Sequence, residues 1–117
     1  PFINGDGEQS RDFTFVENAV QANIRGMFSQ VPGASNRVYN IAFGEKTTVN
    51  QLYFDLKDLV GSEVNPTYRD PRKGDVQDSL ADISKAQTYL GYNPQVSIKD
   101  GLEVTLKWFA ANYGPTR

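Results

Sequence analysis

The sequence of 117 residues contains no cysteine and no histidine. Without cysteine, the chain can form neither disulfides nor thiolate metal sites, and it has no cysteine nucleophile. Without histidine, it lacks the commonest general base and the commonest metal ligand, so a Ser-His-Asp triad cannot be assembled. Chemistry within this chain would have to use carboxylates, lysine, tyrosine, serine or threonine, and we expect no metal site.

An excess of basic charge and a long hydrophobic run are also missing. The chain has 12 Lys and Arg against 14 Asp and Glu, a net charge of -2 that gives no basic excess for binding a nucleic-acid backbone. No stretch approaches the roughly 18 apolar residues of a membrane span. With 38% hydrophobic and 12% aromatic residues, we expect one folded domain over residues 1–117. The absence of cysteine fits a reducing compartment, so we expect a cytoplasmic location.

Hydrophobic periodicity and turn residues predict short strands mixed with helices, a fold of the α/β class. The order is strand, strand, helix, strand, helix, strand, helix, helix. Extended segments are expected at 1–4, 11–16, 38–42 and 64–70, and helices at 18–30, 48–60, 82–90 and 97–114. No internal repeat is visible.

The helices carry recognisable start and stop signals. Thr48 and Gln51 form a capping box, Gly61 is placed as a C-terminal stop, and Ser97 with Asp100 suggests another capped start. Around the first helix, apolar residues recur at helical spacing and predict one buried stripe: Val16, Val20, Ile24, Met27, Phe28 and Val31.

Two motifs suggest nicotinamide chemistry, and we reject both. The segment 5–10 is close to the G-x-G-x-x-G dinucleotide loop, but the residues that follow it have a β pattern, where such a loop requires a helix. We interpret it as a turn. Tyr53 and Lys57 match the Y-x-x-x-K pair of short-chain dehydrogenases/reductases, which lowers the pKa of the phenol. Because Tyr53 lies in an apolar stripe with Leu52 and Leu56, we interpret it as a packing residue.

Arg11, Arg72 and Asp75 are the candidate binding residues. Two guanidinium groups that converge on one place suit a diphosphate, because their planar forks match phosphate oxygens. An aspartate nearby could accept hydrogen bonds from ribose hydroxyls. From spacing alone, however, R-x-G-D in a loop is more often a solvated turn, and an isolated Arg and Asp are more often a surface ion pair.

Several segments together resemble extended short-chain dehydrogenases/reductases. Residues 5–13 match that family's G-D-G-x-x-x-R-D-F signature, and residues 38–44 its Y-N-I-(A/G)-x-G strand. Residues 71–94 contain similar R-x-G-D, D-x-S-K-A and L-G-Y-x-P segments in the same order. The similarity is greatest to UDP-N-acetylglucosamine 4-epimerases, including those of bacterial polysaccharide pathways.

This resemblance implies that the chain is the C-terminal, nucleotide-sugar-binding part of a longer NAD-dependent epimerase. It maps the two phosphate-binding arginines onto Arg11 and Arg72, and the aspartate that approaches the ribose of the UDP-sugar onto Asp75. Asn40 would be structural. The Rossmann domain, with its NAD loop and catalytic Tyr-x-x-x-Lys, would lie upstream, so no catalytic or NAD-binding residue is expected in residues 1–117.

Other family members and another class of protein remain open. The alternatives are a fragment of a nucleotide-sugar 4,6-dehydratase or another extended member, and a non-catalytic nucleotide-binding module on the same scaffold. The expected partners are a UDP-sugar and the protein's own N-terminal Rossmann domain, with neither nucleic acid nor membrane. Family homodimers pair through the upstream domain. The chain should therefore expose an apolar face where that domain docks, and the piece alone should be inactive.

Overall fold

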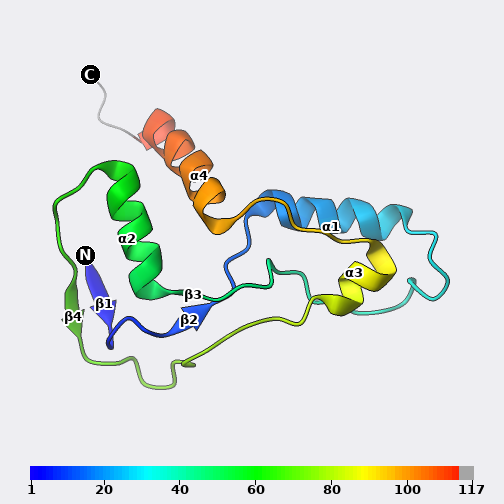
Figure 1. Cartoon of the computed structure of the whole chain (residues 1–117), viewed down its shortest axis with the longest axis horizontal. Helices are drawn as coiled ribbons and strands as arrows, with labels where there is room; N and C mark the ends of the chain where they lie inside the picture. Colours follow the sequence, from blue (N-terminus) through cyan, green and yellow to red (C-terminus); the bar gives the residue numbers. More distant parts are fainter. Residues whose placement is uncertain (114–117) are drawn as a thin grey trace.

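The computed structural model describes residues 1–113 and confirms a mixed α/β fold with the expected order of elements (Figure 1). Four short strands and four helices are present in the described part of the chain. Their bounds are β1 (Phe2–Asn4), β2 (Ser10–Arg11), α1 (Val16–Phe28), β3 (Thr47–Thr48), α2 (Val49–Val60), β4 (Thr67–Arg69), α3 (Ser84–Leu90) and α4 (Ile98–Tyr113).

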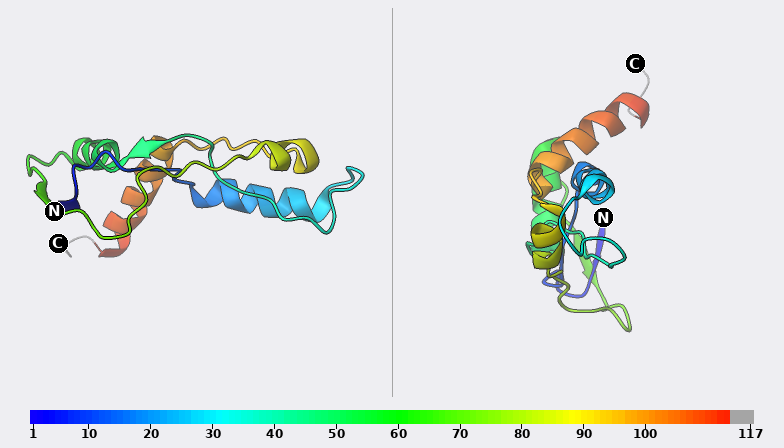
Figure 2. Two further views of the ribbon diagram at one scale, coloured as in Figure 1. Left: turned by 90° about the horizontal axis from the view of Figure 1, so that it is seen from below. Right: turned by 90° about the vertical axis from the view of Figure 1, so that its right-hand side faces the viewer.

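The molecule is flat, with extents of 52 × 40 × 18 Å. Figure 2 shows that α1 and α3 lie at one end, while α2 and the β1–β4 pair lie at the other. Helix α4 packs against α2 and leaves the plane of the slab. In the described residues, none of the helices combines the length and hydrophobicity needed to cross a bilayer.

Two small sheets join segments that are distant in sequence. Strands β1 and β4 pair in parallel, with Asn4 opposite Arg69, and β2 pairs antiparallel with β3, with Arg11 opposite Thr47. A parallel pair needs a long crossover, which here contains α1 and α2. The last residues of β1 and β4 therefore lie at the same edge of their sheet.

The apolar core is small and lies between α1 and α3. It consists of Ala22, Ala34, Ala86, Leu90 and Tyr92. Tyr92 is 1% exposed and donates its hydroxyl to the carbonyl of Ala42 at 2.8 Å. Burial raises the pKa of this phenol, and the negative charge of Asp12 adds to the rise.

The third strand was predicted in the wrong place. Residues 38–42 form no strand, and the third strand is instead β3 at Thr47–Thr48. Side chains take the hydrogen bonds that a neighbouring strand would otherwise make. Lys85 donates to the carbonyl of Val38, Asn40 donates from its amide to the carbonyl of Asp82, and Tyr92 donates to Ala42. The contact made by Asn40 is of the structural kind that the sequence suggested.

The carboxylate of Asp12 collects backbone N–H groups from two loops. It accepts from Phe43 at 3.0 Å, from Gly44 at 3.1 Å and from Ala81 at 3.4 Å. The segment around it is therefore not the strand predicted for 11–16. Strand β2 ends at Arg11, the next residues are held by this side chain, and α1 begins at Val16.

The stripe predicted to be buried on α1 is exposed. Ile24 is 52% exposed, Met27 77% and Phe28 70%, and the other members are also solvent-exposed. The buried residues of α1 are instead Asn18 and Ala22. The physical reason is the flat shape, because α3 covers one side of α1 and no other described element covers the stripe. The expectation that the chain exposes an apolar face is thereby confirmed.

The predicted helix ends are largely correct. Thr48 accepts from the backbone N–H of Gln51 at 3.0 Å, and Gly61 ends α2 in the left-handed region with φ of 62°. Ser97 accepts from the backbone of Asp100 and starts α4. Helix α3 begins two residues after the predicted start at 82, and the predicted end of the last helix at Gly114 lies outside the described residues.

Asn18 joins α1 to the segment that leads into α4. Its side-chain oxygen accepts from the backbone of Gln95 at 3.0 Å and of Val96 at 3.1 Å, and its amide donates to the carbonyl of Val96 at 2.7 Å. Asn18 is 1% exposed. A buried side chain that satisfies three backbone groups is costly to remove, because those groups lose their partners.

We therefore predict that Asn18→Ala lowers the free energy of unfolding by about 2–3 kcal/mol. Asn23→Ala is a matched control on the same helix, since the Asn23 amide bonds only to Ala19 at the exposed surface, and it should change stability by no more than about 0.5 kcal/mol. Urea denaturation measures both. Equal effects of the two substitutions would contradict the prediction.

Candidate functional site

A pocket of about 460 Å³ lies at the carboxyl ends of the parallel strands β1 and β4. Residues 4–6 and 9, in the turn after β1, form one side, and residues 69–72 and 75–77, in the loop after β4, form the other. Ligands of open parallel sheets bind outside the carboxyl ends of the strands, and this volume is in the range of small-molecule sites. We take this pocket as the candidate site.

The turn after β1 has a backbone that requires glycine. Gly5 and Gly7 have φ of 73° and 79°, values that residues with a Cβ rarely adopt. A Cβ on Gly7 would also lie 2.0 Å from the side-chain oxygen of Asn50. The amide of Asn50 donates to the carbonyl of Asp6 at 3.0 Å. The turn leads into β2, as predicted for a connection between two strands.

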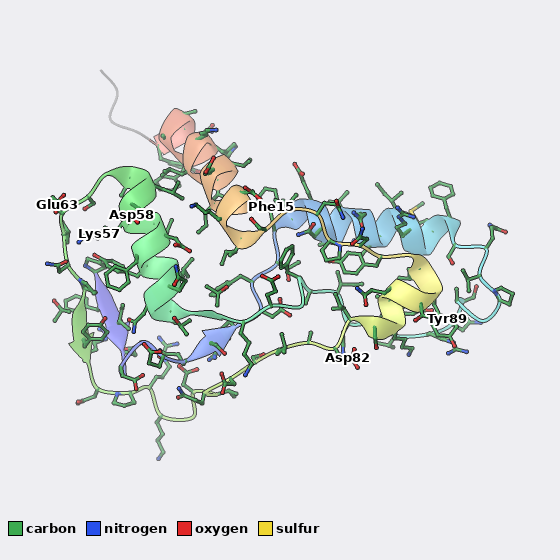
Figure 3. The ribbon with its side chains drawn as sticks, viewed as in Figure 1. Phe15, Lys57, Asp58, Glu63, Asp82 and Tyr89 are labelled. Atoms are coloured by element: carbon green, nitrogen blue, oxygen red, sulfur yellow. The ribbon has the colours of Figure 1, made fainter. Side chains whose placement is uncertain are left out.

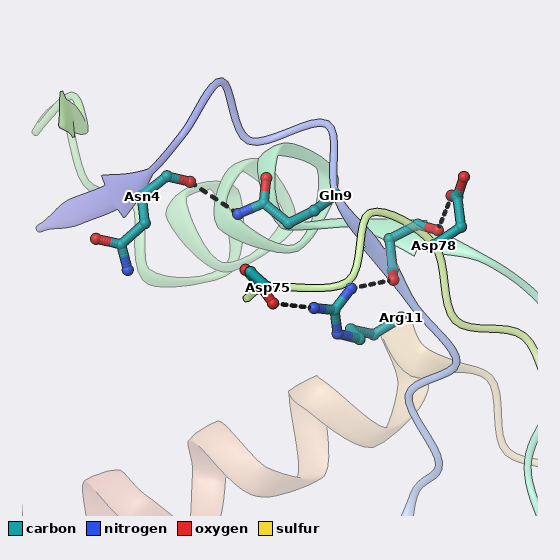
Figure 4. Close-up of polar contacts among 6 residues, drawn as sticks. Asn4, Gln9, Arg11, Asp75 and Asp78 are labelled. Carbon is teal, nitrogen blue, oxygen red and sulfur yellow. Dashed lines mark hydrogen bonds and ion pairs between the residues drawn. The ribbon is translucent and has the colours of Figure 1, made fainter. Parts of the chain in front are cut away.

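Two of the three predicted residues line the pocket, and the third contacts one of them without lining the pocket itself. Arg72 and Asp75 line the pocket. Arg11 instead donates one terminal nitrogen to Asp75 at 2.5 Å and the other to the carbonyl of Ser10 at 2.7 Å (Figure 4). Arg11 is therefore joined to the pocket through the carboxylate of Asp75.

Sequence reasoning did not identify Arg69, Asn4 or Gln9. Arg69 lines the pocket and donates from Nε to the side-chain oxygen of Asn4 at 2.6 Å. Gln9 also lines the pocket, and its amide donates to the backbone carbonyl of Asn4 at 2.8 Å (Figure 4). The signal for Arg69 is its pairing with Asn4 across the β1–β4 sheet, which local sequence patterns do not contain.

Ser10 holds the far end of the pocket loop against β2. It is 2% exposed, its backbone N–H donates to Gln77 at 2.8 Å, and its carbonyl accepts from Ser79 at 3.1 Å. Its hydroxyl donates to Asp78 at 2.6 Å. This hydrogen bond is the main cause of a lowered pKa for Asp78. The ammonium group of Lys46, 3.3 Å from the Asp78 carboxylate, lowers that pKa further. Residues 77–79, which follow Asp75 by two to four positions, are thereby fixed beside β2.

The Tyr53–Lys57 pair lies elsewhere and makes structural contacts. The hydroxyl of Tyr53 donates to the carbonyl of Val64, and Lys57 donates to the side chain of Asn65 at 2.9 Å. Figure 3 shows Lys57 beside the connection between α2 and β4. Neither residue lines the pocket. These contacts favour the packing interpretation of Tyr53.

The described chain is similar to solved epimerases. It superimposes on a UDP-glucose 4-epimerase of Thermotoga maritima, solved with UDP-glucose, with a TM-score of 0.86 and 43% identity over 94% of this chain and 34% of that one. A UDP-N-acetylglucosamine 4-epimerase of Methanobrevibacter ruminantium, solved with UDP-N-acetylmuramic acid, gives 0.85 and 38% over 95% of this chain and 34% of that one. A UDP-glucuronic acid 4-epimerase of Bacillus cereus, solved with UDP-glucuronic acid and NAD, gives 0.86 and 29% over 96% and 35%.

These similarities define the class of the protein as an extended short-chain dehydrogenase/reductase of the nucleotide-sugar epimerase and dehydratase type, which confirms the resemblance seen in the sequence. Residues 1–105 match the family described as GDP-mannose 4,6 dehydratase, and the chain belongs to this family. The chain spans about a third of the length of the curated relatives that it matches.

The contact between Ser10 and Asp78 gives a prediction about pH. Because the folded-state pKa of Asp78 is lowered, its interactions stabilise the fold above the ordinary pKa of an aspartate, and this contribution is lost as the pH falls through the lowered value. Ser10→Ala should raise the pKa of Asp78 toward its ordinary value, as measured by NMR titration of the carboxyl carbon. Ser29→Ala, which removes a hydroxyl bonded to Tyr89, is the control. An unchanged pKa in the Ser10 variant would contradict the assignment.

Proposed function

We propose that this chain is the UDP-sugar-binding part of a longer NAD-dependent UDP-sugar 4-epimerase. It holds the diphosphate and ribose of the substrate while the sugar is epimerised at C4. One observation carries the proposal: Arg72 and Asp75, with Arg11 bonded to Asp75, lie at the carboxyl ends of β1 and β4. The similarity to epimerases that were solved with UDP-sugars supports it.

The diphosphate is assigned to the guanidinium groups of Arg72, which lines the pocket, and of Arg11, which is joined to the pocket through Asp75. Arg72 is exposed at the pocket wall, where its fork can bond two phosphate oxygens at once. Arg11 offsets the charge of Asp75, so the carboxylate at this end of the pocket does not repel an anion as a free one would. A local pair of arginines is sufficient for an anionic ligand even in a chain of net charge -2.

The ribose is assigned to Asp75. One oxygen of its carboxylate bonds Arg11, and an ionised carboxylate has a second oxygen that can accept from a ribose hydroxyl. The ion pair with Arg11 fixes the orientation of that second oxygen. Asp75 thus connects the phosphate end of the ligand to its nucleoside end.

The contribution of this part to catalysis is positional. Contacts to the nucleotide are remote from C4, so they can keep the substrate bound while the sugar turns between its two orientations. We assign no NAD site to the described residues, because the glycine turn after β1 runs into strand β2, whereas a dinucleotide loop leads into a helix. We propose that NAD, like the catalytic Tyr-x-x-x-Lys, belongs to an N-terminal Rossmann domain of the longer protein.

The exposed stripe on α1 is the surface that we assign to that domain. Its residues are 43–77% exposed, although their spacing is that of a helix face that packs against protein. The full-length protein is proposed to be a cytoplasmic homodimer that pairs through the upstream domain.

Within this function, we propose UDP-N-acetylglucosamine or UDP-glucose as the substrate and a role in polysaccharide biosynthesis. A nucleotide-sugar 4,6-dehydratase is the second candidate, since the matched family is described by that activity. The sequence of the upstream catalytic segment would distinguish an epimerase from a dehydratase, because a dehydratase has additional acidic groups beside its catalytic tyrosine. Turnover of each UDP-sugar by the full-length protein is the direct test.

We predict that Arg72→Ala or Arg11→Ala in the full-length protein weakens binding of the UDP-sugar by about ten- to a hundredfold, because each removes charge-assisted hydrogen bonds. Lys73→Ala is the matched control, since it removes the same charge from the same loop but Lys73 does not line the pocket. Isothermal titration calorimetry gives the Kd. Unchanged affinity and turnover in both arginine variants would overturn the phosphate assignment.

We also predict that residues 1–117 expressed alone show no epimerisation and bind UDP-sugars weakly. In the full-length protein, Ile24→Lys should lower thermal stability, because it places a charge in the proposed interface on α1. Lys99→Ala, a charge change on α4, serves as the control. Measurable turnover by the isolated 117-residue chain would contradict the assignment of the catalytic groups to another domain.

A further inference from the structure

One face of the β1–β4 sheet is left open by the described residues. Side chains alternate along a strand, so Phe2, Asn4 and Arg69 share one face, whereas Ile3 and Tyr68 share the other. Ile3 is 4% exposed, and the hydroxyl of Tyr68 donates to Asn50 of α2 at 2.9 Å. The face with Arg69 is exposed, and Phe2 is 69% exposed on it.

The guanidinium group of Arg69 is held in place on this open face by two contacts. Its Nε donates to the side-chain oxygen of Asn4 at 2.6 Å, and its Cζ lies 5.2 Å from the centre of the Phe2 ring. Within residues 1–113, the structure shows no hydrogen bond or ion pair for its two terminal nitrogens. The Arg69 guanidinium is therefore held at its Nε edge by Asn4 and on one face by the Phe2 ring, and its other face remains available for a ligand.

The pocket has a different character at its two ends. Arg72 and Asp75 line the part formed by the loop after β4, whereas Asn4 and Gln9 provide amides on the side with Arg69. The carboxylates of Asp6 and Asp70 also line the pocket, and they disfavour a phosphate close to them. Neutral amides suit the edge of a nucleobase, and planar guanidinium groups stack on its face. The proposed function assigns the diphosphate to the side with Arg72, so the side with Arg69 is left for the base.

We propose that the guanidinium of Arg69 is a stacking platform for the base of the bound nucleotide. This inference rests on the proposed function, because it assumes that a UDP-sugar occupies the pocket. Arg69 then contributes to affinity through the base and not through the diphosphate. The Phe2 ring and the Asn4 amide act as positioning groups that keep the platform flat.

The test compares binding of UDP with binding of inorganic pyrophosphate, which has no base, to the full-length protein. Arg69→Ala should weaken UDP by roughly tenfold, which corresponds to the loss of one stacked base, and leave pyrophosphate within twofold. Arg69→Lys keeps the positive charge but has no planar guanidinium group. It should therefore recover less than half of the change in log Kd for UDP that Arg69→Ala causes. Phe2→Leu removes the ring behind the guanidinium and should weaken UDP by a smaller factor.

Two further variants make the outcomes distinguishable. Arg37→Ala removes an arginine that stacks on Tyr89 at 4.4 Å outside the pocket, and it should leave both affinities unchanged. Arg72→Ala should weaken UDP and pyrophosphate alike. Equal loss of both ligands in Arg69→Ala, full rescue by Arg69→Lys, or unchanged UDP binding overturns the stacking role. If wild-type protein binds no UDP, or Arg72→Ala leaves both affinities unchanged, the proposed function itself fails and this inference falls with it.

Discussion

The fold depends on a single carboxylate placed where two loops meet. Asp12 follows strand β2 and accepts hydrogen bonds from the backbone of Phe43, Gly44 and Ala81. An ionised carboxylate has the lone pairs for several such bonds, whereas a neighbouring strand could not turn to reach both loops. These contacts hold the backbone directly after Arg11, the residue that pairs with Asp75. Asp12 itself does not line the pocket.

The second constraint is the shortage of buried apolar surface. A slab 18 Å thick has little interior. Buried polar side chains therefore make many of the contacts between segments that an apolar core makes in thicker proteins. Asn18, Tyr92 and Ser10 are each nearly fully buried, and each binds backbone groups of another segment. The apolar residues that do not find room in the slab lie exposed on α1. A protein of three times this length, like the relatives, has the material to cover them.

The candidate site is assembled where the parallel strands β1 and β4 end together. The turn after β1 supplies glycines and amides, and the loop after β4 supplies charge, from positions about 65 residues later in the chain. Asn50 of α2 bonds the turn after β1, and Ser10 of β2 bonds the loop after β4. The pocket residues are consequently held by contacts to neighbouring elements.

The order of the elements, the caps at Thr48, Gly61 and Ser97, and the glycine turn could be predicted from the sequence alone, because each depends on residues within four positions of one another. Arg72 and Asp75 could be selected for the same reason, together with the family resemblance. The place of the third strand, the exposure of the α1 stripe and the position of Arg69 were decided by tertiary structure. Each depends on which distant segment lies alongside, and a hydrophobic or charged pattern specifies a face without specifying what covers it. Asn4 meets Arg69 only because β1 and β4 pair in one particular register.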